Sequence, residues 1–469
     1  MGKYYLAVDI GASSGRHILG HLENGKIELE EIYRFENGMD HKDGKLLWNV
    51  DRLFGEIVAG MRKCKEFGKI PVSMAIDTWA VDYVLLDEQD RILGDTYGYR
   101  DHRTDGMDAE VAKILPETEL YAKTGIQKQI FNTIYQLMAV KQKEPELLQR
   151  AKTLLMLPDY FGFRLTGNKL SEYTNGSTTQ LVNPTIFQWD TDLIRKLGYP
   201  EDIFLPLQMP GTTVGQLLPE IQKEVGFNLE VVLCGSHDTA SAVMAVPQAS
   251  GDGIYISSGT WSLMGIESLK PIINKDAAAA NFTNEGGYDH RFRFLKNIMG
   301  LWMIQSVRHE YNDAYSFALL CEMAEESRDF PSRVDVNDSS FLSPDSMVEA
   351  IKQYCQKTGQ PVPESVGELA SVVYRSLAQS YGETVSSLEK IAGRTYDSIH
   401  IIGGGSNAAY LNQLTADATG KTVYAGPGEA TAIGNLLAQM IHAEELADLK
   451  SARKCVRESF EIKTFVPEK

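Results

Sequence analysis

The sequence predicts an α/β protein of two domains, and three observations support this prediction. The chain has 469 residues, 43% of them hydrophobic, which is enough for more than one buried core. Strand-like apolar runs alternate with stretches of helical periodicity along the chain. Each half opens on a strand–turn–strand pattern whose turn is small, contains glycine and is rich in hydroxyl groups, at 11–15 and at 257–260. These paired turns place the join near residue 246, with domains over 1–245 and 246–469.

In the first half, the expected strands are apolar runs bounded by turn residues, at 4–10, 73–78, 81–86 and 229–233. A further apolar run continues from the first turn through Leu19. Between Asp108 and Leu205, apolar residues recur near a period of 3.6, which predicts helices. The run at 229–233 ends abruptly at Gly235, so the polar residues after it are expected at the end of a buried strand.

In the second half, the polar, glycine-containing segment 247–253 is the expected domain boundary. The strands expected after it lie at 253–257, 261–266 and 399–402. A long amphipathic helix is expected at 364–391, and an alanine-rich helix at 431–443.

The composition excludes several classes of partner. The formal net charge is −17 and the pI is near 5.1, so nucleic acid and anionic membrane surfaces are repelled overall. The mean hydropathy is −0.23, and no apolar run is long enough to span a bilayer. The five cysteines are scattered, as reduced thiols are, and no signal-peptide pattern precedes the first strand. We therefore expect a soluble cytoplasmic protein.

The two hairpin turns are candidates for binding phosphate. Consecutive small residues expose backbone N–H groups that can hold phosphate oxygens. Beside the first turn, Arg16 can add positive charge and Asp9 can hold Mg²⁺ through water. The alternative is an ordinary hairpin in which Asp9 caps a strand. One such turn in each half suits a triphosphate that is gripped between two domains.

The glycine triplet at 403–405 follows the strand expected at 399–402. Three glycines at the carboxyl end of a strand let a flat ring approach the backbone closely, which suits an adenosine. The alternative is a loop that leads into a helix capped by Ser406 or Asn407.

Asp238 lies just past the buried strand expected at 229–233. A carboxylate at this place can accept a hydroxyl proton and orient the oxygen toward an incoming phosphorus, as kinases require. The neighbours His237 and Thr239 can hydrogen-bond other hydroxyls. The alternative is a helix start with Asp238 as the N-cap and His237 packed inside.

Aromatic and polar residues are mixed at 77–82 and 99–103. Sugars favour stacking faces and paired hydroxyl partners, so these segments suit a polyol. The alternative is a strand interface with surface ion pairs.

Taken together, these segments resemble the FGGY family of carbohydrate kinases over essentially the whole chain. The most specific matches are strings of the sequence: Asp77-Thr78-Trp79, GSHDTAS at 235–241, SSGTWSLMG at 257–265, NEGG at 284–287, LKNIMGLW at 295–302 and the glycine triplet with LNQL at 411–414. The HDT and SGTWSLMG strings are most similar to the branch of the family that acts on L-rhamnulose.

The resemblance implies two ribonuclease-H-like domains of the actin/hexokinase type, flanking a deep catalytic cleft. The implied activity is ATP-dependent phosphorylation of L-rhamnulose at O1 in L-rhamnose catabolism, with ATP as cosubstrate and Mg²⁺ as cofactor. The implied partners are a small ketose and ATP, without nucleic acid or membrane, and the protein is a monomer or homodimer. The alternatives are a kinase for L-fuculose or L-xylulose, or an ATP-binding sugar sensor or chaperone-type ATPase on the same scaffold.

The resemblance also implies roles for single residues. Asp238 is the expected catalytic base, and Asp9 is the expected organiser of Mg²⁺. The expected sugar contacts are Ala80, His237, Asp238, Thr239 and Asn297. The expected ATP contacts are Ala12, Ser13, Ser14, Gly15, Arg16, Thr260, Gln305 and Gly404. Ala80 stands where the family has a sugar-contacting glycine, and its methyl group narrows the expected pocket slightly.

Overall fold

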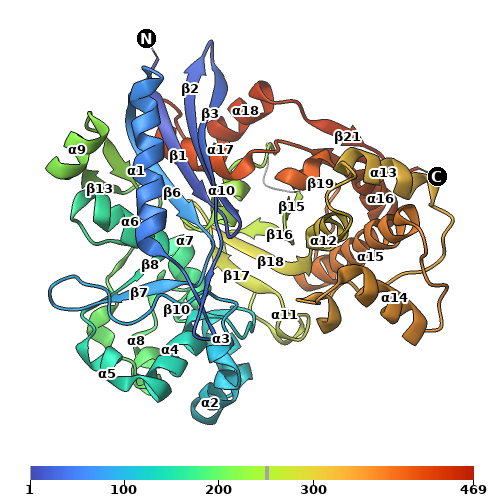
Figure 1. Cartoon of the computed structure of the whole chain (residues 1–469), viewed down its shortest axis with the longest axis horizontal. Coiled ribbons are helices and arrows are strands. Elements are labelled where there is room, and N and C mark those ends of the chain that lie inside the picture. Colours follow the sequence, from blue (N-terminus) through green and yellow to red (C-terminus); the bar gives the residue numbers. More distant parts are fainter. Residues whose placement is uncertain (1, 249–252, 469) are drawn as a thin grey trace. The chain divides into compact units, whose positions relative to one another are not determined.

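The computed structural model describes residues 2–248 and 253–468, so most of the boundary expected at 247–253 lies outside the described residues. The chain folds into two compact units. Unit 1 comprises Met1–Ala245, Glu267–Phe294 and Thr431–Ser459, and unit 2 comprises Val246–Ile266, Leu295–Ala430 and Phe460–Lys469. Each unit contains a sheet with helices, so the predicted α/β class is confirmed (Figure 1).

The main sheet of unit 1 has the strand order β13-β14-β6-β1-β2-β3. Its strands are β1 (Tyr4–Ile10), β2 (Ser14–Glu23), β3 (Lys26–Glu36), β6 (Pro71–Thr78), β13 (Thr213–Gln216) and β14 (Glu230–Val232). The strands β1, β2 and β3 form antiparallel hairpins, whereas β6 and β14 run parallel to β1. The parallel strands are buried on both faces, as strands covered by helices on each side are.

Residue alternation along β1 explains how helices cover both faces of this sheet. Leu6 and Val8 belong to a core shared with α1 (Val50–Glu66) and α6 (Leu157–Thr166). Tyr5 and Ala7 point to the opposite face and pack against α17 (Ala430–His442).

The other helices of unit 1 are α2 (Met107–Ile114), α3 (Glu117–Thr124), α4 (Thr133–Lys143), α5 (Pro145–Arg150), α7 (Tyr173–Gly176), α8 (Thr191–Leu197), α9 (Pro219–Val225), α10 (Asp238–Met244), α11 (Lys275–Ala279) and α18 (Leu449–Ser459). Its short paired strands are β4 (Asp40–Lys42) with β5 (Lys45–Leu47), β7 (Tyr83–Leu86) with β8 (Thr153–Met156), β9 (Ser171–Glu172) with β12 (Leu207–Gln208), and β10 (Val182–Asn183) with β11 (Gln188–Trp189).

The prediction that 108–205 is helical throughout is wrong in part, because four short strands interrupt the helices. The apolar run of β8 pairs antiparallel with β7 and is fully buried, so its burial comes from a strand partner. A short apolar run has no period that separates a buried strand from a buried helix.

The second sheet has the order β17-β18-β16-β15-β19-β20-β21, and most of its strands lie in unit 2. They are β15 (Ile254–Ser258), β16 (Trp261–Ser268), β17 (Thr283–Gly286), β18 (Phe292–Met299), β19 (Ser398–Ile402), β20 (Thr422–Ala425) and β21 (Lys463–Phe465). A hairpin, β15–β16, is followed across the sheet by two strands parallel to β15 and then by an antiparallel edge strand. This arrangement repeats that of β2, β1, β6, β14 and β13, so the predicted similarity of the two halves is confirmed.

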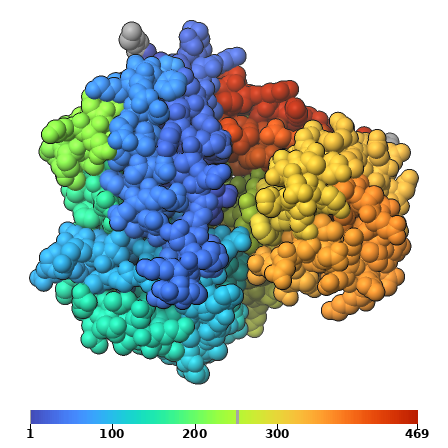
Figure 2. Space-filling view, viewed as in Figure 1, coloured from blue at the N-terminus to red at the C-terminus, as the bar shows by residue number. Residues whose placement is uncertain are grey.

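The helices of unit 2 are α12 (Trp302–Glu310), α13 (Phe317–Glu326), α14 (Met347–Lys357), α15 (Val366–Ala392) and α16 (Ala409–Thr419). In Figure 2, the gold and orange part of the chain, which contains these helices, forms much of the visible face of this unit. The long predicted helix is confirmed as α15. It begins after Ser365, which forms a capping box with Glu368, and it ends at Gly393 in the left-handed conformation.

Candidate functional site

Three strand ends meet at one edge of the unit 1 sheet. In the parallel register of β1 and β6, Asp9 pairs with Asp77. The chain after β14 continues beside β6, where His237 bridges Thr78 and the Thr78 amide donates to the Ser236 carbonyl at 2.9 Å. Because parallel strands present their carboxyl ends at the same edge, this edge gathers the acidic and polar residues that the sequence singled out.

Asp9 is the buried carboxylate at the end of β1. It is 6% exposed, and its Oδ2 accepts from Nε of Arg16 and pairs with Nη2 of Arg16, both at 3.0 Å. Burial raises the pKa of Asp9 above its usual range, and the positive charge of Arg16 opposes that rise. Arg16, expected beside phosphate, thus also neutralises a carboxylate of its own hairpin.

Asp77 lies beside Asp9 and is held by a hydrogen-bonded chain from α17. Its Oδ2 accepts from Asn435 Nδ2 at 2.6 Å, Asn435 Oδ1 accepts from Gln439 at 2.8 Å, and Gln439 Oε1 accepts from Ser73 at 2.7 Å. Burial and the neighbouring Asp9 raise the pKa of Asp77 well above its usual range. Among the described residues, its Oδ1 has no hydrogen-bond partner, although it is buried.

Asp238 is the first residue of α10, and its side chain is 33% exposed. Its Oδ1 accepts from the Thr239 amide at 2.5 Å and from Thr239 Oγ1 at 3.1 Å, and lies 3.4 Å from His237 Nε2. Within the described part of the chain, no hydrogen bond or ion pair reaches Oδ2. The helix N-cap is His237, so Asp238 does not serve as the N-cap.

His237 lies against a fully buried cation. Its Nδ1 is 3.1 Å from Nη2 of Arg293 on β18 and 3.4 Å from Oε2 of Glu285 on β17. Arg293 also donates through Nε to the Gly286 carbonyl at 2.8 Å and pairs with Glu285 at 3.1 Å. Burial would raise the pKa of Glu285, but the charge of Arg293 holds it below its usual range.

Ala80 precedes a strained residue. Val81 has a φ of 69°, a conformation that β-branched residues rarely adopt. Its carbonyl accepts from Thr133 Oγ1 at 2.7 Å and from Gln136 Nε2 at 3.2 Å, and these bonds hold the turn. The strand expected at 81–86 therefore begins only at Tyr83.

Asp82 accepts hydrogen bonds from one aromatic residue of each predicted polyol segment and from Trp48. Its Oδ2 accepts from the indoles of Trp48 at 2.6 Å and Trp79 at 2.9 Å and from the Tyr99 amide at 3.0 Å. The two indole rings lie 4.0 Å apart between centroids. Burial raises the pKa of Asp82 to about 6, although these donors oppose the rise. The structure thus joins the segments 77–82 and 99–103 at one carboxylate.

The β1–β2 turn contains the predicted phosphate-binding residues Ala12, Ser13, Ser14 and Gly15. The Gly11 amide donates to the Ser14 carbonyl at 2.8 Å, and Asn37 donates through Nδ2 to the Gly11 carbonyl at 2.8 Å. A Cβ at Gly15 would lie 2.1 Å from the ring of Phe35, so any larger residue there would require this ring to move. Ser13 is exposed at the tip.

The equivalent turn of unit 2 contains Thr260, which is exposed. The turn packs against the glycine triplet after β19, because a Cβ at Gly405 would lie 2.0 Å from Ser258 Oγ and one at Gly403 would lie 2.9 Å from the Ser258 carbonyl oxygen. Gly403 also has a φ of 81°. Gly404, the predicted adenosine contact, is exposed with open space around it, so the neighbouring glycines serve packing and Gly404 leaves the backbone accessible.

The two remaining predicted residues of unit 2 lie on β18 and α12. Asn297 is half-buried, and its Oδ1 has no hydrogen-bond partner among the described residues. Gln305 lies one turn into α12, whose first residue donates its amide to the Thr260 carbonyl at 3.1 Å. The turn and α12 are therefore fixed to each other within unit 2.

The described residues contain no group of three or more His, Cys, Asp or Glu that could hold a metal ion directly. Asp9 has a carboxylate at the site edge and Asp77 has an unpartnered buried oxygen, a donor set that fits an ion held mainly through water. All five cysteines are free thiols. None of the helices in the described chain has the length and apolar character needed to cross a membrane.

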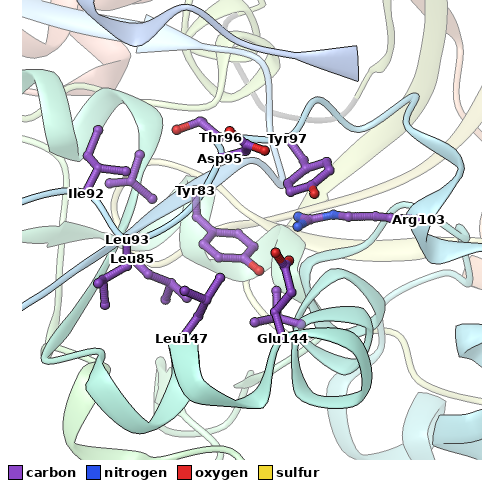
Figure 3. A pocket seen from close by; sticks show the side chains of 12 residues that line it. Tyr83, Leu85, Ile92, Leu93, Asp95, Thr96, Tyr97, Arg103, Glu144 and Leu147 are labelled. Atoms are coloured by element: carbon purple, nitrogen blue, oxygen red, sulfur yellow. The ribbon is translucent and has the colours of Figure 1, made fainter. Parts of the chain in front are cut away.

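A separate small cavity in unit 1 is bounded by β7, the segment after it and α4 (Figure 3). Figure 3 shows Tyr83, Arg103 and Glu144 turned toward the same space. The cavity has about 10 Å³ open to water, room for a single molecule, so it holds neither a sugar nor a nucleotide.

The sequence did not predict two residues of the unit 1 site. Asn435 and Arg293 come from segments far along the chain from Asp77 and His237, and neither belongs to a recognisable motif. Glu285 belongs to the NEGG string, which carried no role of its own. The only sequence signal for Arg293 and Glu285 would have been an arginine and a glutamate on neighbouring strands that are both expected to be buried.

Comparisons with known proteins agree over both units. Residues 4–245 match the N-terminal domain of the FGGY family of carbohydrate kinases, and residues 254–443 match its C-terminal domain. A rhamnulokinase of Halalkalibacterium halodurans is 54% identical over 464 residues, which cover 99% of each chain. A rhamnulokinase of Oceanobacillus iheyensis is 50% identical over 99% of this chain and 98% of its own.

Among solved structures, xylulose kinase from Lactobacillus acidophilus superposes with a TM-score of 0.81 at 16% identity, covering 99% of this chain and 94% of that one. This likeness shows the fold, so the expected pair of ribonuclease-H-like domains of the actin/hexokinase type is confirmed.

Proposed function

The chain belongs to the FGGY family of carbohydrate kinases, and on that premise we propose that it transfers the γ-phosphoryl group of ATP to O1 of L-rhamnulose, giving L-rhamnulose 1-phosphate and ADP. Its place would be L-rhamnose catabolism. The near full-length similarity to proteins named rhamnulokinase supports the choice of sugar.

The environment of Asp238 is the observation that carries the proposal. Oδ1 accepts from the amide and the hydroxyl of Thr239 and has His237 Nε2 3.4 Å away, whereas Oδ2 receives no donor from the described residues. Oδ2 is therefore the oxygen that accepts the proton of the sugar hydroxyl as that hydroxyl attacks the γ-phosphorus in line. Asp238 thus acts as the catalytic base.

The sugar is proposed to contact Ala80, His237, Thr239 and Asn297 as well as Asp238. Asn297 has an unpartnered amide oxygen that can accept a hydroxyl. Ala80 directly precedes the turn held at Val81, so this turn is the expected filter between ketoses.

The nucleotide is proposed to contact the β1–β2 turn through residues 12–16 and unit 2 through Thr260, Gln305 and Gly404. Backbone amides of the two turns can stabilise charge on the phosphate oxygens. Asp9 would hold Mg²⁺ through water, and the ion would offset charge that develops toward ADP. We propose the corresponding division of labour, with the sugar, the first turn and the base in 1–245, and the second turn and adenosine in 246–469.

We expect the protein to work in the cytoplasm, as a monomer or a homodimer. Four of its five free thiols are buried, and none needs an oxidising compartment.

A coupled ADP-release assay across a panel of ketoses tests the substrate. We expect the highest kcat/KM with L-rhamnulose and much lower values with L-fuculose and L-xylulose. A higher kcat/KM with either of those sugars would assign the chain to that ketose instead. ADP release that does not respond to any sugar would favour a sensor or chaperone-type ATPase and contradict the kinase proposal.

A further inference from the structure

His237 is in contact with two charged groups: one can only donate hydrogen bonds, and the other can only accept them. The guanidinium of Arg293 has five donors and no acceptor, and it stays protonated in proteins. The carboxylate of Glu285 can only accept. These two groups meet the same ring nitrogen, Nδ1, at 3.1 Å and 3.4 Å.

The geometry of these contacts decides which atom of His237 carries the proton. Nη2 of Arg293 is in hydrogen-bond geometry with Nδ1, so Nδ1 must offer its lone pair. Oε2 of Glu285 is within ion-pair distance of both groups, yet among the described residues it has no aligned hydrogen bond. A proton on Nδ1 would face the Arg293 donor at 3.1 Å, which is unfavourable.

We propose that Arg293, with Glu285 as its counterion, is a positioning residue that fixes His237 as the neutral imidazole with its proton on Nε2. The N–H at Nε2 then lies beside Asp238, with Oδ1 3.4 Å from the nitrogen. The role of Asp238 rests on the proposed function, whereas the position of the proton on His237 does not.

The consequence for Asp238 concerns its two oxygens. With the proton on Nε2, the N–H lies near Oδ1, which also accepts from the amide and hydroxyl of Thr239, and Oδ2 stays available to the sugar hydroxyl. With the proton on Nδ1, the Nε2 lone pair would face Oδ1 and repel it. Arg293 is fully buried and held by the Gly286 carbonyl and Glu285, so it keeps the ring in one state.

The test is the long-range ¹H–¹⁵N spectrum of protein labelled with ¹⁵N histidine, recorded at neutral pH without sugar or ATP. A His237→Gln variant assigns the signal among the nine histidines. We expect the protonated nitrogen to be Nε2 in the wild type and in Glu285→Gln, which keeps the arginine. In Arg293→Met, Nδ1 gains a proton, because only Glu285 then faces it.

A proton on Nδ1 in the wild type would overturn the proposal, as would an unchanged spectrum in folded Arg293→Met. Since Arg293→Met leaves a buried carboxylate without its partner, it can fail to fold, and the wild-type spectrum then decides alone. With L-rhamnulose, Arg293→Met should lower kcat by about tenfold or more while KM for ATP stays within about twofold. An inactive wild type that shows the Nε2 proton would contradict the proposed function and leave this inference standing.

Discussion

Single residues at the edge of the unit 1 sheet compensate the buried carboxylates of this acidic chain. The net charge is −17, yet Asp9 is neutralised by Arg16, and Asp77 is held by the neutral amide of Asn435. A buried carboxylate needs such a partner, because burial without one costs several kcal/mol. The buried carboxylates of this edge are therefore compensated by partners within the site itself.

The buried His17 on β2 makes the stability of unit 1 depend on pH. Its Nε2 contacts the Ile57 carbonyl at 3.1 Å, and burial lowers the pKa of His17 to about 4 from its usual 6.5. The unfolded chain therefore binds a proton below pH 6.5 that the folded chain does not take up, so stability falls between pH 6.5 and 4. Between pH 7 and pH 5 the loss amounts to about 2 kcal/mol.

The His17→Gln variant keeps an amide donor near Ile57 and removes the titration. We expect its unfolding free energy, measured in urea, to fall by about 2 kcal/mol less than that of the wild type between pH 7 and pH 5. Equal losses in the two proteins would show that His17 does not cause the pH dependence.

At the residue scale, the sequence identified the groups that lie in motifs and missed those that act through them. Asp9 lies near the end of a strand that leads into a glycine-containing turn, and His237 and Asp238 lie just past a strand, next to Ser236 and Thr239, which is a local signal. Asn435 and Arg293 reach the site through tertiary packing, so no spacing in the chain reveals them.

At the scale of elements, α10 is positioned by backbone contact with α17. A Cβ added at Gly434 of α17 would lie 1.7 Å from the Ser241 carbonyl oxygen of α10. No side chain can move to relieve this overlap, because the neighbouring atom is backbone. Since α10 begins at Asp238, the packing of these two helices sets the position of the proposed base.

Gly434→Ala should therefore displace α10. We expect it to lower the free energy of unfolding by about 1–3 kcal/mol and to reduce kcat more strongly than KM for ATP. The matched control is Gly55→Ala in α1, where a Cβ meets no atom within 4 Å and alanine should stabilise the helix by up to about 1 kcal/mol. Wild-type stability and turnover in Gly434→Ala would contradict the proposed packing role.

Strong periodic elements were predictable, and irregular ones were not. The strand at 4–10 and the long helix α15 match their predicted ranges closely, because period and capping signals agree there. The strand expected from Val81 starts two residues later, since long-range bonds to Thr133 and Gln136 stabilise a strained turn. Such bonds have no local sequence signature.

At the scale of the whole molecule, one sheet arrangement occurs twice. In both units a hairpin is followed across the sheet by two strands parallel to the first and an antiparallel edge strand. The matching turns after β1 and β15 were visible in the sequence, and they predicted the two-domain architecture. The sequence did not reveal that segments 267–294 and 431–459 return to unit 1, because a return of the chain depends on packing.

The central claim is that the chain is a ketose kinase whose base is Asp238. The most direct test compares the wild type with Asp238→Asn in the ADP-release assay with L-rhamnulose and ATP, while calorimetry measures sugar binding to each. We predict that Asp238→Asn folds and binds the sugar, but that its turnover falls by more than the roughly 10²–10⁴-fold of simple proton transfer. Near-normal turnover by Asp238→Asn would contradict the account.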